Sequence, residues 1–170
     1  MKFKLYHKAF ITALLILSCC TISFAQQNKE DKKQEKYTEV RNLVNSKKYV
    51  FVVQTVLPLR GRAINPTSSF DLTVSGDTLV SDLPYFGRAY VAPIDPSEGG
   101  FHFTSTNFDY TVKERKKDGW DIEISPKDAK DVRQMLLTVT ESGYGSLQVI
   151  SNNRQQISYN GYIKEIKGKR

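Results

Sequence analysis

Hydrophobic residues along this chain follow two different periods. Tyr37, Val40, Leu43 and Val44 lie on one helical face, which predicts a short amphipathic helix over about 31–46. From Tyr49 onward the period becomes two, as in β-strands. The first strand is apolar on both faces, so we expect it to be covered on both sides, its outer face by the helix. The predicted strands are 49–57, 70–74, 78–83, 101–105, 109–116, 120–125, 132–140, 145–151 and 156–163.

Glycine-containing turns between these strands predict their register. A loop over 141–143 with Gly143 left-handed sets Val139 against Gly145, Leu137 against Leu147 and Met135 against Val149. A turn centred on Asn153 then sets Val149 against Ile157, Leu147 against Tyr159 and Gly145 against Gly161. The turn at 76–77 pairs Val74 with Leu79 and Phe70 with Leu83. The glycine pair 145/161 indicates a sharp bend or a close approach of two backbones.

The length of the loop before Trp120 is predicted from the pairing of charges across the two strands. A three-residue loop over 117–119, with Gly119 left-handed, places Val112 opposite Ile124 and Glu114 opposite Ile122. It also places Lys113 opposite Glu123 and Arg115 opposite Asp121, so that opposite charges face each other across the strands. We therefore predict this register.

A run of consecutive antiparallel hairpins predicts an all-β fold with one short N-terminal helix. The simplest closure is an up-and-down barrel whose first and last strands pair, leaving no exposed edge. A two-sheet β-sandwich is the alternative.

The first 25 residues are typical of a secretory signal. Lys2, Lys4 and Lys8 precede an apolar run over 9–22, and Ser23-Phe24-Ala25 supplies small residues for cleavage before Gln26. The run is short for a membrane-spanning helix. Ile16-Leu17-Ser18-Cys19 is similar to a lipoprotein box, so membrane attachment is expected only if Cys19 is lipidated. We predict export to the periplasm, the outer membrane or the medium.

Removal of those 25 residues leaves 145 of 170 and no cysteine, so stability must come from a packed core. The net charge falls from +7 to +4, because three lysines are lost. That mild excess does not indicate nucleic-acid binding. The predicted organisation is a signal peptide (1–25), a flexible charged tether (26–36), one β-barrel domain (37–163) and a basic tail (164–170).

Residues for catalysis or metal binding are sparse. His102 is the only histidine after residue 25, and its place between Phe101 and Phe103 predicts a polar-face strand residue. Zinc sites need several His or Cys ligands, so we expect no metal and no cofactor. Asp121 and Glu123 share a strand face, but the predicted register gives both basic partners, which argues against a glycosidase pair. We predict no catalytic residue, and a hydrolase is the weakest hypothesis.

Two segments are candidates for binding. Tyr85, Phe86, Arg88 and Tyr90 form either the rim of a pocket, with Arg88 for an anionic or carbonyl group, or a plug in which Arg88 stacks on rings at the barrel end. Arg60 and Arg62 flank Gly61 in a loop and form a weaker candidate for anion binding. Solvated surface arginines are the alternative there.

Several segments of the chain resemble one family. LPLRGRAINPTSSFDLTVSGDTLVSDLPYFGRAYVAP and SGYGSLQVISNNRQQISYNGYI are similar to the signature segments of a secreted bacterial family catalogued as domain of unknown function 4251. The likeness runs from about Tyr37 to Ile163. The resemblance implies export in Bacteroidetes-type bacteria and a lipocalin-like barrel, and it assigns no catalytic residue. Our hypothesis is an exported, non-catalytic binding module for a small apolar or amphipathic ligand or a partner protein. The alternative is a structural or interaction protein of the cell envelope.

Overall fold

The computed structural model of the protein describes residues 30–90, 99–116 and 119–166. The predicted signal peptide with Cys19, residues 26–29 of the predicted tether, the loop residues 117–118 and the end of the predicted basic tail lie outside the described residues. The chain divides into two compact units, 1–36 and 37–170. In the first unit, residues 30–36 are helical and mostly exposed, so this part of the predicted tether is a helix.

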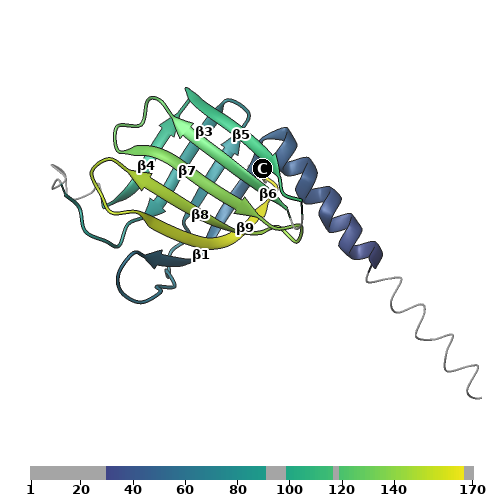
Figure 1. Ribbon diagram of the computed structural model, residues 1–170, viewed down its shortest axis with the longest axis horizontal. Coiled ribbons are helices and arrows are strands. Elements are labelled where there is room, and N and C mark those ends of the chain that lie inside the picture. Colours follow the sequence, from purple (N-terminus) through teal and green to yellow (C-terminus); the bar gives the residue numbers. More distant parts are fainter. Residues whose placement is uncertain (1–29, 91–98, 117–118, 167–170) are drawn as a thin grey trace, which may run out of the picture. The chain divides into compact units, whose positions relative to one another are not determined.

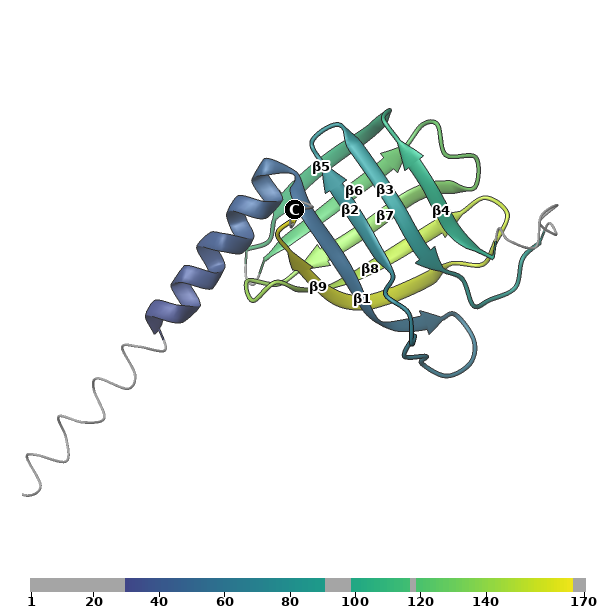
Figure 2. The same ribbon diagram turned by 180° about the vertical axis from the view of Figure 1, so that it is seen from behind.

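The second unit is an antiparallel β-sheet of nine strands that curls into a nearly closed barrel (Figures 1 and 2). The strands are β1 (Lys48–Pro58), β2 (Asp71–Ser75), β3 (Thr78–Pro84), β4 (Gly100–Ser105), β5 (Phe108–Glu114), β6 (Trp120–Pro126), β7 (Val132–Val139), β8 (Tyr144–Ser151) and β9 (Ile157–Lys164). Their order in the sheet is β4-β3-β2-β1-β9-β8-β7-β6-β5. The predicted all-β meander and the predicted pairing of first and last strands are both confirmed.

The predicted absence of sheet edges needs a correction, because β4 and β5 are the two ends of the sheet order. Neighbours in that order are antiparallel, so β4 and β5 run in the same sense, and only Thr106 and Asn107 separate them. They are therefore two halves of one bent strand, which pairs with β3 before the corner and with β6 after it. Counting that strand once leaves eight, an even number, as closure with alternating directions requires. The corner is held by Lys127 N–H, which donates to Asn107 O at 2.8 Å.

Three turns have the predicted register. The pairs Leu137↔Leu147, Val149↔Ile157 and Val74↔Leu79 are all observed, and Gly143 has a φ of 86°. Gly145 and Gly161 are opposite each other, and a Cβ on Gly161 would lie 1.9 Å from Val52 O. The glycine pair therefore marks a close backbone approach, as predicted.

The predicted register between β5 and β6 is wrong by two residues. Val112 pairs with Ile122, and Lys113 pairs with Asp121. The difference lies at Gly119, which has a φ of 111° and accepts a hydrogen bond from Arg115 N–H at the base of the hairpin. Gly119 also lies against Val139 O, where there is no space for a Cβ. Because the shift is an even number of residues, the inward and outward faces of both strands are unchanged.

The core is made of inward-facing strand residues and one face of the helix. The fully buried large side chains are Tyr49, Phe51, Leu72, Leu79, Leu83, Ile124, Met135, Leu137, Leu147, Ile157 and Tyr159. They occupy the interior of the barrel, where burial of each one stabilises the fold by about 1.5–3 kcal/mol.

The helix runs over 30–46, and its last turns contact β5 and β6 instead of the outer face of β1. Tyr37 stacks on Trp120 at 5.5 Å, and Tyr110 OH donates to Val44 O at 3.4 Å. Val50 and Val52, on the outer face of β1, remain only half-buried, so the predicted helical cover of this face is wrong. The helical residues 37–46 instead close the end of the barrel where β1 begins, here called the helix end; the opposite end is the loop end. The described part of the chain contains no helix long and apolar enough to cross a membrane.

Candidate functional site

The segment 85–90 leaves β3 at the loop end and crosses to the turn between β8 and β9. Tyr90 N–H donates to Asn153 O at 2.7 Å, and Gln155 N–H donates to Arg88 O at 3.0 Å. A single β-bridge joins Ala89 to Arg154. These backbone contacts fix a segment that its sequence alone would leave irregular, because Pro84 ends the strand before it.

Beneath this segment lies a buried arginine that the sequence analysis missed. The Arg154 guanidinium lies 5.3 Å from the centre of the Tyr85 ring and 5.2 Å from that of Phe101. Those two rings meet edge to face at 5.5 Å. Arg154 Nη1 donates to Gly100 O at 3.2 Å. The cation is thus held between two aromatic rings, an arrangement that is favourable when water is excluded.

The charge of Arg154 is balanced by Asp131. Arg154 Nε lies 2.7 Å from Asp131 Oδ2, with 9% of the arginine side chain and 27% of the aspartate side chain exposed. Among the described residues no hydrogen-bond donor is aimed at Asp131 Oδ2, so this contact is an ion pair and not a directed hydrogen bond. Asp131 Oδ1 accepts a hydrogen bond from Ser151 Oγ at 2.8 Å. Ser151 Oγ in turn accepts from Arg154 N–H at 3.0 Å, which closes the network.

The four predicted rim residues divide between inside and outside. Tyr85 is half-buried, and its hydroxyl donates to Arg88 O at 2.8 Å. Phe86 and Tyr90 are 41% and 64% exposed, and Arg88 is also exposed. The cation that stacks on rings is therefore Arg154 and not Arg88. No local signal reveals this, because Asp131, Arg154 and Tyr85 come from distant parts of the chain.

Two buried tyrosine hydroxyls complete the anchoring of this end. Tyr159 OH donates to Pro84 O at 2.7 Å, at the point where β3 ends. Burial raises the pKa of Tyr159 and that of Tyr85. Both phenols therefore stay protonated and remain donors at neutral pH.

Arg60 and Arg62 also lie at the loop end. Both are exposed, in a turn closed by backbone hydrogen bonds between Val56 and Ile64. Gly61 stands between them with a φ of 114°. Among the described residues, no hydrogen bond or ion pair joins these arginines to segment 85–90, so the structure does not bring the two candidate sites together.

His102 faces outward from β4, as predicted. Its Nδ1 lies 2.7 Å from Asp82 Oδ1, and both side chains are about half exposed, at 45% and 54%. The other ring nitrogen, Nε2, lies over Gly100. Within the part of the chain that the structure describes, no group of three or more His, Cys, Asp or Glu side chains could hold a metal ion.

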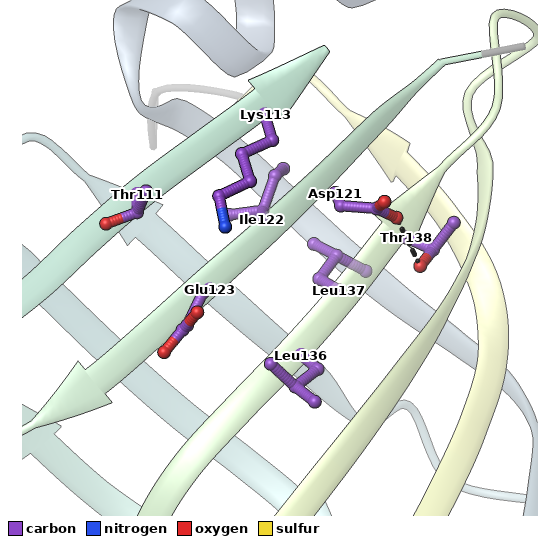
Figure 3. Close-up of a pocket in the computed structure, with 8 residues that line it drawn as sticks. All are labelled: Thr111, Lys113, Asp121, Ile122, Glu123, Leu136, Leu137 and Thr138. Atoms are coloured by element: carbon purple, nitrogen blue, oxygen red, sulfur yellow. Dashed lines mark hydrogen bonds between the residues drawn. The ribbon is translucent and has the colours of Figure 1, made fainter. Parts of the chain in front are cut away.

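A hollow of about 270 Å³ lies on the outer face of β5, β6 and β7, and its lining combines polar side chains with the apolar side chains of Ile122, Leu136 and Leu137 (Figure 3). Its outward-facing side chains form two rows across the strands: Lys113, Asp121 and Thr138 in one, and Thr111, Glu123 and Leu136 in the other. Asp121 accepts a hydrogen bond from Thr138 Oγ1 at 2.9 Å and lies 3.7 Å from Arg115 Nε. Glu123 accepts a hydrogen bond from Gln134 Nε2. The predicted register had placed Lys113 opposite Glu123, but Lys113 lies opposite Asp121.

Comparison with known proteins gives a family and a fold. A family model described as "Domain of unknown function (DUF4251)" matches residues 31–163. The crystal structure of a DUF4251 family protein from Bacteroides eggerthii DSM 20697 is similar, with a TM-score of 0.57 and 15% sequence identity. The similarity covers 76% of this chain and 87% of that one. At this identity the likeness speaks for the fold alone. No curated protein matches the chain.

Proposed function

Since this chain belongs to the DUF4251 family of domains of unknown function, we propose that it is an exported, non-catalytic interaction module that binds a partner protein through the rim at its loop end. We define the rim as Phe86, Arg88 and Tyr90. The observation that carries the proposal is the exposure of Phe86 and Tyr90, at 41% and 64%, on a segment anchored from below by Arg154.

Exposed aromatic and arginine side chains on a rigid support are typical of protein interfaces. Phe, Tyr and Arg are enriched at such interfaces, and the residues that dominate binding energy are often aromatic or arginine. A segment that is already ordered loses little conformational entropy when it binds. Backbone hydrogen bonds from Tyr90 and to Arg88 supply that order here.

A protein partner fits better than a small ligand inside the barrel. Large side chains such as Phe51, Met135 and Tyr159 are fully buried in the interior. A ligand held there would have to displace them, and each displacement would cost close packing. We therefore assign recognition to the exposed rim.

Site-specific photo-crosslinking in the native host tests the proposal. A photoreactive phenylalanine analogue replaces Tyr90 in one strain and Tyr144 in another; the latter is a matched control, 58% exposed at the helix end. We expect one stoichiometric protein adduct from position 90 alone, and its loss when Phe86→Ala is added. The same adducts from both positions, or none from position 90, would refute the rim as an interface.

Export is tested separately by cell fractionation and N-terminal sequencing. We expect a mature chain that begins at Gln26, or at Cys19 if that residue carries lipid. A full-length chain that retains Met1 and stays in the cytoplasm would contradict this part of the proposal.

A further inference from the structure

The two rows that border the hollow continue across the outer face of β8 and β9. Thr138 pairs with Ser146, which pairs with Asn160, and Leu136 pairs with Gln148, which pairs with Ser158. Figure 1 looks onto the strands β7, β8 and β9 that carry these pairs. The two rows are two residues apart along each strand, which separates them by about 6.6 Å. They form one polar band with the hollow at its β5–β7 end.

Most members of the band carry short, uncharged, hydrogen-bonding side chains. Beyond the hollow it presents two serines, an asparagine and a glutamine, all exposed or half-buried. Inside the hollow, Asp121 and Glu123 supply carboxylate acceptors, and Lys113 supplies an ammonium donor (Figure 3). The band thus offers both donors and acceptors, and its charged members Lys113, Asp121 and Glu123 sum to a formal charge of −1.

Two tyrosines occupy the next row beside the band. Tyr144 and Tyr162 pair across β8 and β9, and their rings meet edge to face at 6.4 Å. Tyr144 is 58% exposed and lies diagonally across from Thr138, at the corner nearest the hollow. An exposed tyrosine ring offers a flat apolar face together with a polar tip.

Several classes of ligand do not fit this face. An extended peptide that adds to a sheet needs a free strand edge, but on β6, β7 and β8 the ladders on both sides use the backbone groups. A polyanion such as nucleic acid would meet Asp121 and Glu123, which repel phosphate. A lipid tail needs a continuous apolar surface, whereas the charged side chains of Lys113, Asp121 and Glu123 interrupt the apolar part of this lining.

We propose that the hollow and the band beside it bind a short neutral oligosaccharide. Sugar hydroxyls donate to Asp121 and Glu123 and accept from Lys113 Nζ. They both donate to and accept from the hydroxyls of Thr138 and Ser146. The apolar face of a neighbouring sugar ring covers Tyr144. A saccharide combines many hydroxyl groups with apolar ring faces. That combination matches a hollow whose lining is both polar and apolar, with an exposed tyrosine two residues along β8 from Ser146. The site is distinct from the rim and does not depend on it.

The test is a titration of the mature chain, residues 26–170, followed by two-dimensional NMR of the backbone amides. The probes are neutral di- and tetrasaccharides of glucose, galactose, mannose and N-acetylglucosamine. We expect at least one probe to shift the amides of Thr138, Ser146 and Tyr144, with a Kd of about 1 mM or tighter. Tyr144→Ala should weaken that binding about tenfold, and Asp121→Asn should also weaken it.

The double variant Phe86→Ala/Tyr90→Ala is the matched control, because its substitutions lie on the rim. It should bind the same saccharide with an unchanged Kd. The rim proposal and this one can therefore fail independently of each other. The spectrum of each variant reports whether it is folded. If no probe shifts these amides at 10 mM, or if Tyr144→Ala binds as tightly as the parent chain, the inference is overturned.

Discussion

Replacing Arg154 by Met removes a cation on which the loop end of the barrel depends. The methionine side chain can still lie between the Tyr85 and Phe101 rings, so the variant tests the charge and not the volume. What disappears is the ion pair with Asp131, the hydrogen bond to Gly100 O and the attraction of the guanidinium to both rings.

The size of the effect follows from burial. Only 9% of the Arg154 side chain is exposed, but 27% of its partner Asp131 is, so solvent partly screens the pair. Breaking a fully buried pair costs about 3–5 kcal/mol, because one charge is left without its partner. With the screening, and with about 1 kcal/mol from the rings, we expect a loss of about 3 kcal/mol in the free energy of unfolding. The melting temperature should fall by about 10 °C.

Urea unfolding of four proteins measures this: the parent chain, Arg154→Met, Asp131→Asn and the double variant. Because the two side chains share one interaction, the double variant should lose at least about 1 kcal/mol less than the sum of the single losses. Arg133→Met, which changes an exposed arginine on β7, is the control and should stay within about 0.5 kcal/mol of the parent. In Arg154→Met, amide exchange at Tyr90 should also accelerate, because the segment above the cation loosens. Losses below about 1 kcal/mol that simply add would refute this reasoning.

Three further predictions concern backbone approach, alkaline stability and the rim. Gly161→Ala should lower the free energy of unfolding by about 3 kcal/mol, because its Cβ would lie 1.9 Å from Val52 O. Gly61→Ala should cost less, because it meets only the strain of a positive φ in open space. The reverse order in urea unfolding would contradict the close approach. Burial raises the pKa of Tyr110 to about 12, whereas the unfolded chain ionises near 10, so the unfolded state binds fewer protons between those values and stability falls as pH rises from 10 to 12. Between pH 9 and pH 12, Tyr110→Phe should lose about 2 kcal/mol less free energy of unfolding than the parent chain. Denaturation at both pH values measures this, and an equal loss in the two proteins would contradict the prediction. Phe86→Ala/Tyr90→Ala should leave the unfolding free energy within about 0.5 kcal/mol, because both side chains are largely exposed; a cooperative loss above 2 kcal/mol would show that they support the fold.

The candidate sites could be predicted only in part. Phe86 and Tyr90 could be proposed as members of a candidate rim from the sequence, because large aromatic residues beside Pro84 are unusual in a connecting segment, and the structure leaves both exposed. Their anchor, Arg154, was missed, since its partners Tyr85 and Asp131 are distant in sequence. The outer hollow was missed because it depends on three strands lying in one register.

Local interactions in the sequence determined the helix, the strands and most of the turns. The turn at 141–143 needs only Gly143 in a left-handed conformation, and alternation of apolar residues then decides which face is buried. The register of β5 and β6 involves a contact with a third strand, because Gly119 lies so close to the backbone of Val139 on β7 that a Cβ there would be 1.9 Å from Val139 O. Closure through the bend at 106–107 and the pairing of Arg154 with Asp131 likewise belong to the tertiary structure. Alternation and turn geometry act over a few residues and can be read along the chain, whereas close backbone approach and buried charge pairing arise only when distant segments meet.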